Sequence, residues 1–401
     1  MDIERRLRQM RRRPEVEAAV SFIRAADAET IVTQVELSEI PAPPFREARR
    51  AGRVAELLGE VGLAPDVDDV GNVVAVRPGK ANEALLVVSA HLDTVFPPGT
   101  DVSVTREGDL LRGPGISDDA RGLAALVALA RALEAGSVRT TSPVLFAATV
   151  GEEGAGDLRG VKRLFSPGGP ARGASGFISL DGAGADRIVV DGLGSRRYRI
   201  TARGPGGHSW LDWGTENPIR IISRLGNGLT ELTLPSGPRT TLTLARIGGG
   251  KSINAIPQES WVEIDTRSAA NDHIDELEES IRDLVRRCQA EHDTLTLDIS
   301  VIGDRPAGKT DREAPLVSAA VAATRAQGIE PILALSSTDA NVPMALGIPA
   351  VTLGCGGEAG QSHTTDEWYR NVRGPEGIVR ALDTLLLVAG MGGQVGPATT
   401  E

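Results

Sequence analysis

Apolar positions in the first third of the chain alternate between helical spacing and short continuous runs. Residues 84–90 read Ala-Leu-Leu-Val-Val-Ser-Ala, and such a run is typical of a strand buried on both faces of a sheet. Residues 143–150 and 177–180 have the same character. Four segments with apolar residues three or four positions apart are predicted helices: residues 16–26, 30–39, 48–61 and 122–133. Strands that alternate with helices indicate an α/β domain with a largely parallel sheet.

The pattern changes near residue 194, where strand-like segments begin to alternate apolar and polar positions. Six elements follow in the order strand, helix, strand, strand, helix, strand, at residues 198–202, 218–229, 240–245, 260–266, 274–289 and 294–301. This order is the split β-α-β plan of ferredoxin-like folds, an antiparallel sheet with both helices on one face. We therefore predict an α+β module at residues 195–305, inserted into an α/β domain formed by residues 1–194 and 306–401.

Composition narrows the function classes. The 401 residues carry 43 basic and 54 acidic side chains, a formal net charge of −11, which argues against general binding to nucleic acid or an anionic membrane. Two cysteines, and no apolar run of the roughly 18 residues that cross a bilayer, fit a cytoplasmic protein. The arginine-rich start, residues 5–13, is expected to form a solvated, frayed helix.

Polar residues follow several of the buried strands, at the edge where α/β sheets bind ligands. His91 and Asp93 come directly after the first apolar run, and residues two apart share a side if strand geometry persists. An imidazole beside a carboxylate suits a metal ligand with its orienting partner. An ordinary hydrogen-bonded histidine at a strand end explains the same pair.

Further segments carry other candidate ligands. Residues 113–119 read Gly-Pro-Gly-Ile-Ser-Asp-Asp before a predicted helix, where either aspartate could instead be a helix cap. Residues 151–154, Gly-Glu-Glu-Gly, place two adjacent carboxylates after the second strand; one could bind a metal while the other transfers protons. Asp181 ends the third strand, and His363 lies in the segment Gln-Ser-His-Thr-Thr-Asp-Glu.

The coincidence of these residues is more informative than any one of them. Two histidines and three carboxylates form a mixed nitrogen and oxygen donor set that suits zinc, cobalt or manganese. One catalytic zinc usually takes three protein ligands and a water, so the larger set fits a pair of ions bridged by a carboxylate and a water. A serine hydrolase is not indicated, because Leu193 and Arg197 occupy the glycine positions of a nucleophile elbow around Ser195.

In these motifs the sequence resembles the metallopeptidases that include peptidase T, carboxypeptidase G, succinyl-diaminopimelate desuccinylase, acetylornithine deacetylase and aminoacylase-1. The resemblance spans about residues 50–390 and rests on His-Leu-Asp-Thr-Val at 91–95, Gly-Pro-Gly-Ile-Ser-Asp-Asp at 113–119, Gly-Glu-Glu-Gly at 151–154 and Ser-His-Thr at 362–364. It implies a zinc-exopeptidase-like, three-layer α/β catalytic domain, with the inserted α+β (ferredoxin-like) module as a lid and dimerisation domain.

The resemblance also implies roles for the candidate residues around two divalent ions, zinc being favoured over cobalt or manganese. The implied ligands are His91 and Asp181 for one ion, Glu153 and His363 for the other, and Asp118 as the bridge between them. Glu152 would be the general base, and Asp93 would orient His91.

One departure from the relatives leaves an alternative open. Many relatives have a lysine and a glycine after the bridging aspartate, whereas residues 119–122 here read Asp-Ala-Arg-Gly. Either Asp118 or Asp119 could therefore be the bridge. Asp118 is preferred because its spacing from Gly115 agrees with the relatives.

The resemblance points to residues outside the ligand set as well. His208 matches a histidine that reaches into the active site of the neighbouring subunit, so a homodimer through the inserted module is expected. Asn254 and Arg267 match residues that contact substrate, and Gly356 falls where relatives offer backbone to it. Two alternatives remain: His208 only closes a turn, and Arg267 pairs with Asp265.

These observations predict a two-metal hydrolase that cleaves an amide bond in short peptides, as an aminopeptidase or dipeptidase similar to peptidase T. An aspartate at the position of Asp181 resembles that branch of the family, whereas a glutamate is more typical of carboxypeptidases and deacylases. Hydrolysis of N-acyl amino acids by a deacetylase, or a carboxypeptidase activity, is the alternative. A non-catalytic metal- or peptide-binding protein would lack one of the key groups, yet Glu152 and all five ligands are present.

Overall fold

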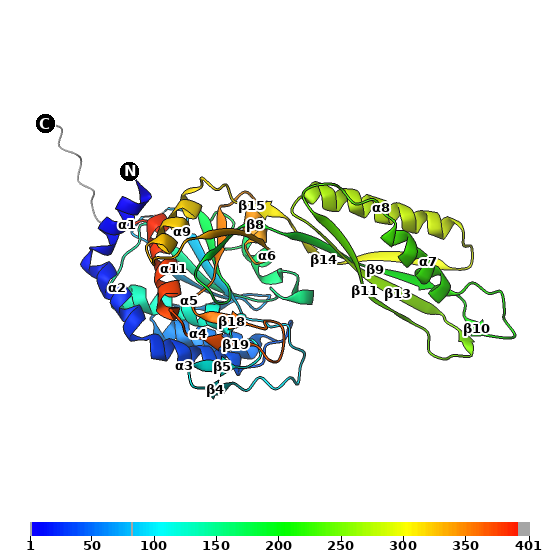
Figure 1. Cartoon of the computed structure of the whole chain (residues 1–401), viewed down its shortest axis with the longest axis horizontal. Helices are drawn as coiled ribbons and strands as arrows, with labels where there is room; N and C mark the ends of the chain where they lie inside the picture. The colour runs from blue at the N-terminus through cyan, green and yellow to red at the C-terminus, as the bar shows by residue number, and fades with distance from the viewer. Residues whose placement is uncertain (1, 82, 392–401) are drawn as a thin grey trace. The chain divides into compact units, whose positions relative to one another are not determined.

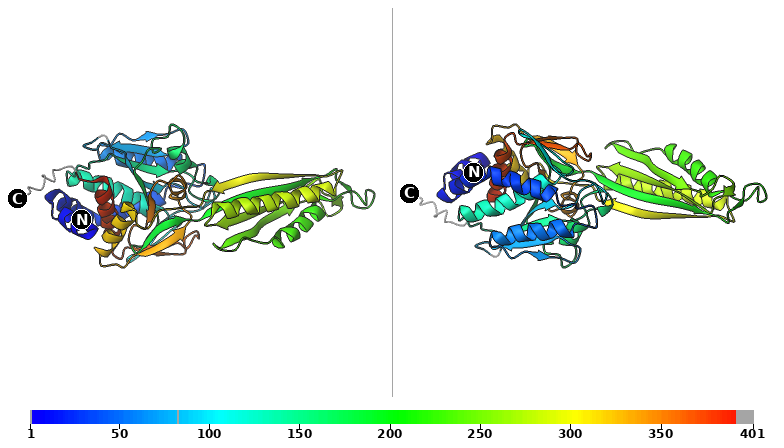
Figure 2. Two further views of the ribbon diagram at one scale, coloured as in Figure 1. Left: turned by 90° about the horizontal axis from the view of Figure 1, so that it is seen from above. Right: turned by 90° about the horizontal axis from the view of Figure 1, so that it is seen from below.

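The computed structural model describes residues 2–81 and 83–391, and the chain divides into two compact units. Unit 1 comprises residues 1–191 and 309–401, and unit 2 comprises residues 192–308. Figure 1 labels the elements, and Figure 2 shows each unit from two further sides. Among the described residues, no helix is long and apolar enough to cross a membrane.

The first part of unit 1 begins with four helices, α1 (Ile3–Arg11), α2 (Pro14–Ala25), α3 (Asp27–Ser38) and α4 (Ala48–Glu60). Five strands follow: β1 (Asp66–Val67), β2 (Val73–Arg77), β3 (Leu86–His91), β4 (Thr105–Glu107) and β5 (Leu110–Arg112). The next elements are α5 (Ala120–Ala135), β6 (Val144–Thr149), the 3-10 turn η1 (Gly154–Gly156), α6 (Arg159–Phe165), β7 (Gly176–Leu180) and β8 (Arg187–Gly192).

The second part of unit 1 follows the insertion. It contains β15 (Gly308–Lys309), α9 (Pro315–Arg325), β16 (Ile332–Ser336), α10 (Asn341–Ala345), β17 (Ala350–Leu353), β18 (Glu358–Gly360), β19 (Trp368–Arg370) and α11 (Gly374–Ala389). A small sheet, in the order β18-β19-β5-β4, joins this part to the first.

The large sheet of unit 1 has the order β1-β2-β6-β3-β7-β17-β8-β15, with β16 paired to β8. Its central strands β6, β3, β7 and β17 run parallel, whereas β2 pairs antiparallel with β6 and β8 antiparallel with β17. Each central strand is buried along its whole length, which is why its sequence is a continuous apolar run. The partly exposed strand β2 was not predicted, although its residues 73–76 are also apolar.

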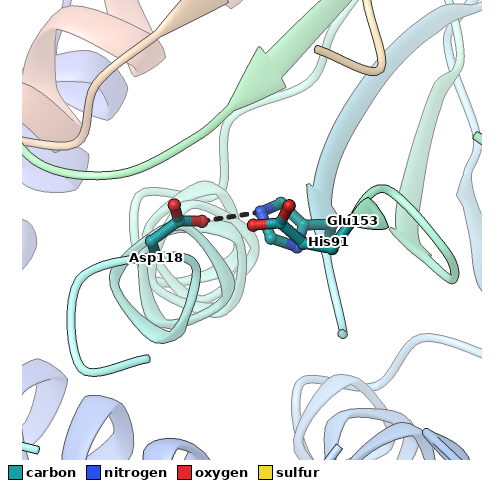
Figure 3. A group of neighbouring side chains, drawn as sticks. All are labelled: His91, Asp118 and Glu153. Atoms are coloured by element: carbon teal, nitrogen blue, oxygen red, sulfur yellow. Dashed lines mark hydrogen bonds and ion pairs between the residues drawn. The ribbon is translucent and has the colours of Figure 1, made fainter. Parts of the chain in front are cut away.

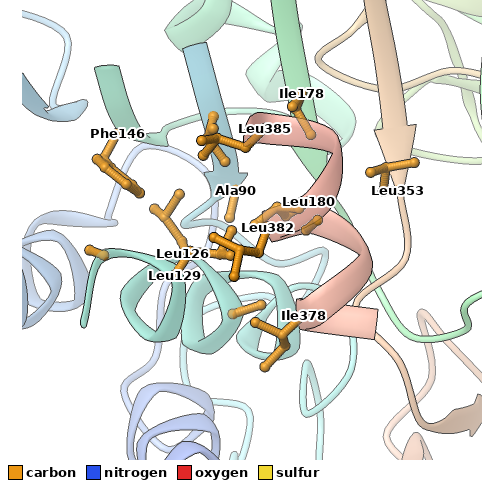
Figure 4. Close-up of a cluster of buried hydrophobic side chains, with 14 of the residues drawn as sticks. Ala90, Leu126, Leu129, Phe146, Ile178, Leu180, Leu353, Ile378, Leu382 and Leu385 are labelled. Carbon is orange, nitrogen blue, oxygen red and sulfur yellow. The ribbon is translucent and has the colours of Figure 1, made fainter. Parts of the chain in front are cut away.

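Helices cover both faces of this sheet. On one face, Ala90 and Ile178 pack in the cluster that includes α5 and α11, as Figure 4 shows. On the other face, Val87, Leu145 and Phe177 pack with residues of α6 and α10. Neighbouring strand residues thus enter opposite cores, as strand geometry requires. The predicted fold class, a three-layer α/β domain, is confirmed.

Helix α1 differs from the solvated, frayed helix expected for the arginine-rich start. Leu7 and Met10 are buried in the main core. The guanidinium of Arg11 pairs with the fully buried carboxylate of Asp383 in α11. The expectation was wrong because the many arginines obscure a short apolar face on one side of the helix.

Unit 2 contains β9 (Gly194–Arg203), β10 (Gly207–His208), α7 (Pro218–Thr230), β11 (Thr240–Gly249), β12 (Ala255–Ile256), β13 (Glu259–Ser268), α8 (Asn271–Ala290) and β14 (Thr296–Arg305). Its main sheet has the order β11-β13-β9-β14 and is antiparallel throughout. Ile200 and Val262 of the sheet share one apolar cluster with Ile222 of α7 and Ile281 of α8, so both helices cover the same face. This is the split β-α-β arrangement that the sequence pattern predicts.

The pairing of Arg11 with Asp383 generates a stability prediction. Replacing Arg11 by alanine leaves a buried carboxylate without its charged partner, so Arg11→Ala is expected to lower the free energy of unfolding by about 3 kcal/mol. The measurement is urea denaturation followed by circular dichroism.

Arg8→Ala is the matched control, because Arg8 lies on the same helix with a side chain that is 64% exposed beside Glu4. An exposed pair of this kind contributes less than about 1 kcal/mol. Equal effects of the two substitutions would contradict a docked α1.

Candidate active site

Three central strands deliver candidate ligands to the same edge of the sheet. His91 is the last residue of β3, Glu152 and Glu153 come shortly after β6, and Asp181 directly follows β7. Because β6, β3 and β7 are parallel, their carboxyl ends meet at this edge. The sheet therefore brings together residues that are far apart in the sequence.

Asp118 lies between the two candidate histidines. Nε2 of His91 is 3.0 Å from Oδ1 of Asp118, and Nε2 of His363 is 3.1 Å from Oδ2. Nε2 of His363 is also 2.9 Å from Oε1 of Glu153. Figure 3 shows the side chains of His91, Asp118 and Glu153 turned toward one another. The carboxylate of Asp118 thus has the position from which a ligand can bridge two ions.

The potential ligand atoms form two overlapping groups. Those of His91, Asp118 and Glu153 lie within 4.8 Å of one another, and so do those of His91, Asp119 and Asp181. Each group combines imidazole nitrogen with carboxylate oxygen, the donor set of zinc, cobalt and manganese sites. The chemistry and spacing of these residues fit a pair of divalent cations.

Negative charge is concentrated at this edge. Burial raises the pKa of Asp181 to about 7, and the carboxylate of Asp118 adds to that shift. Hydrogen bonds to Asp118 and Glu153 raise the pKa of His363 to about 10. Burial lowers the pKa of His91, but the charges of Asp119 and Asp118 outweigh burial and raise it. The same surroundings that favour imidazolium cations would favour metal cations.

Asp93 holds the loop that carries the two glutamates. Its buried carboxylate accepts hydrogen bonds from the backbone N–H groups of Glu152 at 2.9 Å and Glu153 at 2.8 Å. The carboxylate is 3.8 Å from Nδ1 of His91, whereas the backbone carbonyl oxygen of Asp93 is 3.0 Å from that nitrogen. Asp93 thus contacts Nδ1 of His91 more closely through its carbonyl oxygen than through its carboxylate, and its role in orienting His91 stays a prediction.

Asp119 ties three segments together. Its fully buried carboxylate accepts hydrogen bonds from the backbone N–H groups of His91 at 2.9 Å, Gly122 at 3.0 Å and Gly182 at 3.0 Å. The side chain of the preceding residue, Asp118, contacts the two histidines instead, and the peptide bond between the two aspartates is cis. Of the two alternatives for a bridging ligand, this geometry favours Asp118.

Glu367 holds the loop that carries Asp118, and the sequence analysis did not single it out. Its fully buried carboxylate accepts hydrogen bonds from the backbone N–H groups of Gly115 at 3.0 Å, Ser117 at 2.8 Å and Asp118 at 2.9 Å. Burial raises the pKa of Glu367 to about 7. Since Glu367 is four positions after His363, it joins two ligand-bearing loops. Its place in the His363 motif was the available signal, but only the tertiary fold shows its partners.

Close packing explains why residue 356 is a glycine. Gly356 has a φ of +79° and lies so close to the start of α11 that a Cβ atom would clash with the carbonyl oxygen of Gly374. Its N–H group donates to the carbonyl oxygen of Gly184 at 2.8 Å. The predicted contact of its backbone with substrate stays a prediction.

The predicted residues of unit 2 lie in turns and ion pairs of their own. Nδ1 of His208 accepts hydrogen bonds from the N–H groups of Trp210 and Leu211, at 3.2 and 3.4 Å. Nε of Arg267 is 2.6 Å from Oδ2 of Asp265. These contacts agree with the two alternatives that the sequence left open, in which His208 closes a turn and Arg267 pairs with Asp265.

Asn254 lies beside the His208 turn, because its carbonyl oxygen accepts a hydrogen bond from the N–H of Ser209 at 3.1 Å. Its side-chain oxygen accepts a second hydrogen bond from the hydroxyl of Ser252 at 2.5 Å. The catalytic and substrate-binding roles of His208, Asn254 and Arg267 remain predictions.

The chain is similar to several hydrolases. Over 119 residues the chain is 40% identical to a putative [LysW]-lysine/[LysW]-ornithine hydrolase of Pyrococcus abyssi, a match that covers 30% of this chain and only 32% of the relative. It is 27% identical to a putative succinyl-diaminopimelate desuccinylase of Mycobacterium tuberculosis, across 87% of this chain and 94% of the relative. The crystal structure of a tripeptidase from Staphylococcus aureus superposes with a TM-score of 0.73 at 21% identity, covering 90% of this chain and 98% of that one. This last likeness shows a shared fold.

A parallel sheet edge with this donor set is typical of a metal-dependent hydrolase. Residues 87–389 match the family described as Peptidase family M20/M25/M40, and the chain belongs to that family. It is a hydrolase of a metallopeptidase family, as the sequence motifs predict.

The three hydrogen bonds of Glu367 generate a prediction for metal binding. Glu367→Gln replaces one acceptor oxygen by an amide nitrogen and removes the charge, so the loop around Asp118 loses part of its anchor. Loss of such an outer contact typically weakens metal binding roughly 10- to 100-fold. The affinity for zinc is measured by competition with a chromogenic chelator.

Glu313→Gln is the matched control, because Glu313 is exposed and lies outside the ligand loops. The far-ultraviolet circular dichroism of both variants should equal that of the unsubstituted protein. Unchanged zinc affinity in a folded Glu367→Gln protein would show that this carboxylate does not position Asp118.

Proposed function

We propose that this protein is a two-metal hydrolase of short peptides that acts as an aminopeptidase or dipeptidase. The observation that carries the proposal is the carboxylate of Asp118 between His91 and His363, with Glu153 and Asp181 beside them. His91 and Asp181 would hold one ion, Glu153 and His363 the other, and Asp118 would contact both. Zinc suits this donor set, with cobalt or manganese as alternatives.

Two ions bound here would make a water acidic near neutral pH and polarise the carbonyl of the scissile amide. Glu152, buried in the loop that Asp93 holds, takes the proton from the attacking water and delivers it to the leaving amine as the carbon–nitrogen bond breaks. Because the N–H groups of Glu152 and Glu153 share the carboxylate of Asp93, the base and its neighbouring ligand keep a fixed spacing.

The choice of short peptides is supported by the aspartate at position 181 and by the fold shared with the tripeptidase of Staphylococcus aureus. A second candidate activity is hydrolysis of N-acyl amino acids, which the similarity to a putative desuccinylase favours. The two buried, unpaired cysteines agree with the cytoplasmic location that the sequence predicts.

The two activities are separated by a substrate panel. Enzyme loaded with zinc, cobalt or manganese is assayed with free di- and tripeptides and with N-acetyl and N-succinyl amino acids. We expect turnover of the free peptides, and turnover of the acylated compounds alone would replace the first proposal by the second. A chelator should abolish turnover, and added metal should restore it.

Glu152→Gln is the matched variant for this panel, because it keeps the shape of the side chain and removes its basicity. Its turnover number is expected to fall about 1,000-fold, the order of a lost general base, while its metal content stays at that of the unsubstituted enzyme. Retained turnover would remove Glu152 from the proposed role.

We further propose a homodimer through unit 2, with His208 acting in the partner's active site. Figure 1 shows β10, which ends at His208, at one end of unit 2. The turn that follows exposes Trp210 to 83% and Trp213 to 88%, and the neighbouring loop exposes Ile253 fully. Several exposed apolar side chains on neighbouring loops are typical of a protein–protein interface.

The dimer is tested by analytical ultracentrifugation of the protein and of a Trp210→Ser, Trp213→Ser variant. We expect a dimer that the double substitution weakens at least tenfold, because buried tryptophans contribute strongly at interfaces. A monomeric protein with full activity would contradict both the dimer and the role of His208 in the partner's site.

A further inference from the structure

An arginine of unit 1 lies at the same sheet edge as the candidate ligands. Leu353 of β17 pairs with Leu180 of β7 on one side and with Ile188 of β8 on the other. Asp181 follows Leu180, and Arg187 precedes Ile188, so both emerge at this edge. Since neighbouring strands are about 4.8 Å apart, the Cα atoms of Asp181 and Arg187 are separated by about 10 Å, two strand spacings.

Asp181 and Arg187 line one cavity. Its volume is about 640 Å³, and Asp118 also contributes to its wall. Residues 182–185, which follow Asp181, are glycine and alanine, so the wall has only small side chains there. A cavity of this size suits a small organic ligand. The substrate group beside the scissile amide therefore has room here.

The side chain of Arg187 is exposed to solvent. Within residues 2–81 and 83–391 it forms no ion pair. The backbone carbonyl oxygen of Arg187 accepts a hydrogen bond from Nη1 of Arg380 at 3.3 Å. Arg267, which the sequence suggested as a residue that contacts substrate, is paired through Nε with Asp265 in unit 2. The side chain of Arg187 is therefore available to a ligand of this cavity.

The wall of the cavity carries other charged side chains besides Arg187. Arg373 donates to the backbone carbonyl of Gln327 and adds a second positive charge to the wall. Asp186 also lies in the wall. Burial lowers the pKa of Arg380 to about 10, and the charges of Cys355 and Asp186 oppose that shift. Glu358 is the remaining acidic group of the wall outside the candidate ligands.

We propose that Arg187 binds the free carboxylate of the substrate and selects small substrates in which a carboxylate lies one residue from the scissile amide. A guanidinium offers two parallel N–H donors to a carboxylate. Consecutive Cα atoms are 3.8 Å apart, so a single residue bridges the space between the ligands and an inward-turned Arg187 side chain. This inference rests on the proposed amide hydrolysis and names dipeptides and N-acyl amino acids as the substrates that Arg187 favours.

The test compares acids with their amides. Leucylglycine is compared with leucylglycinamide, and N-acetyl-leucine with N-acetyl-leucinamide, on the zinc-loaded protein and its Arg187→Gln variant. We expect Arg187→Gln to lower kcat/KM for the acid about 10- to 100-fold, through KM, and to leave the amide within about twofold, as for the loss of one hydrogen-bonded charge pair. Arg187→Lys keeps the positive charge but not the two parallel N–H donors, so its kcat/KM for the acid should lie between those of Arg187→Gln and the unsubstituted protein.

Arg172→Gln is the control for a lost surface charge, because Arg172 is exposed and does not line this cavity. It should leave both substrates unchanged. If Arg187→Gln slows the acid and the amide equally, or if Arg267→Gln alone removes the preference for the acid, the proposal is overturned.

A binding measurement distinguishes failure of this inference from failure of the proposed function. Isothermal titration of the acid and the amide into the Glu152→Gln protein measures the preference without turnover. Binding of the acid that Arg187→Gln weakens would support the inference even if no substrate were hydrolysed, and such an inert enzyme would contradict the proposed function alone. Equal binding of acid and amide would overturn the inference alone.

Discussion

The site depends on three buried carboxylates that hold the backbone of the ligand-bearing loops. Asp93 anchors the loop after β6, Asp119 joins the end of β3 to the residue after Asp181, and Glu367 anchors the loop before α5. Parallel strands bring distant loops to one edge, but strand ends alone do not fix side chains to within a fraction of an ångström. Hydrogen bonds from N–H groups to charged acceptors are short and strong, and buried ones are shielded from water.

This arrangement has a cost that the rest of unit 1 must offset. Burying an ionised carboxylate is unfavourable unless hydrogen bonds and opposite charges replace its water. The N–H groups supply the hydrogen bonds, and the imidazoles of His91 and His363 supply positive charge. The continuous apolar cores on both faces of the sheet supply the stability that a cluster of like charges would otherwise remove.

The sequence predicted the central parallel strands because a strand buried on both faces is a continuous apolar run. It predicted the plan of unit 2 because a strand buried on one face alternates apolar and polar residues. It did not predict the antiparallel strand β2, although residues 73–76 are apolar. It also did not predict the docking of α1, whose apolar face is short. In the site it placed His91, Asp118, Glu153 and His363 together. It preferred Asp118 to Asp119 only through the spacing that the relatives share. It could not foresee which atoms of Asp93 meet His91, or find Glu367, because these depend on which distant backbone each side chain faces.

The way unit 2 is connected has a consequence for its removal from the chain. The insertion leaves unit 1 through β8 and returns through β15, which are neighbours in the same sheet. The two crossing points are therefore as close as the ends of a hairpin, and the host sheet does not need the insert to complete its order. A short link between β8 and β15 would therefore span the gap that removal of unit 2 leaves in unit 1, as is typical of a domain inserted at neighbouring chain ends.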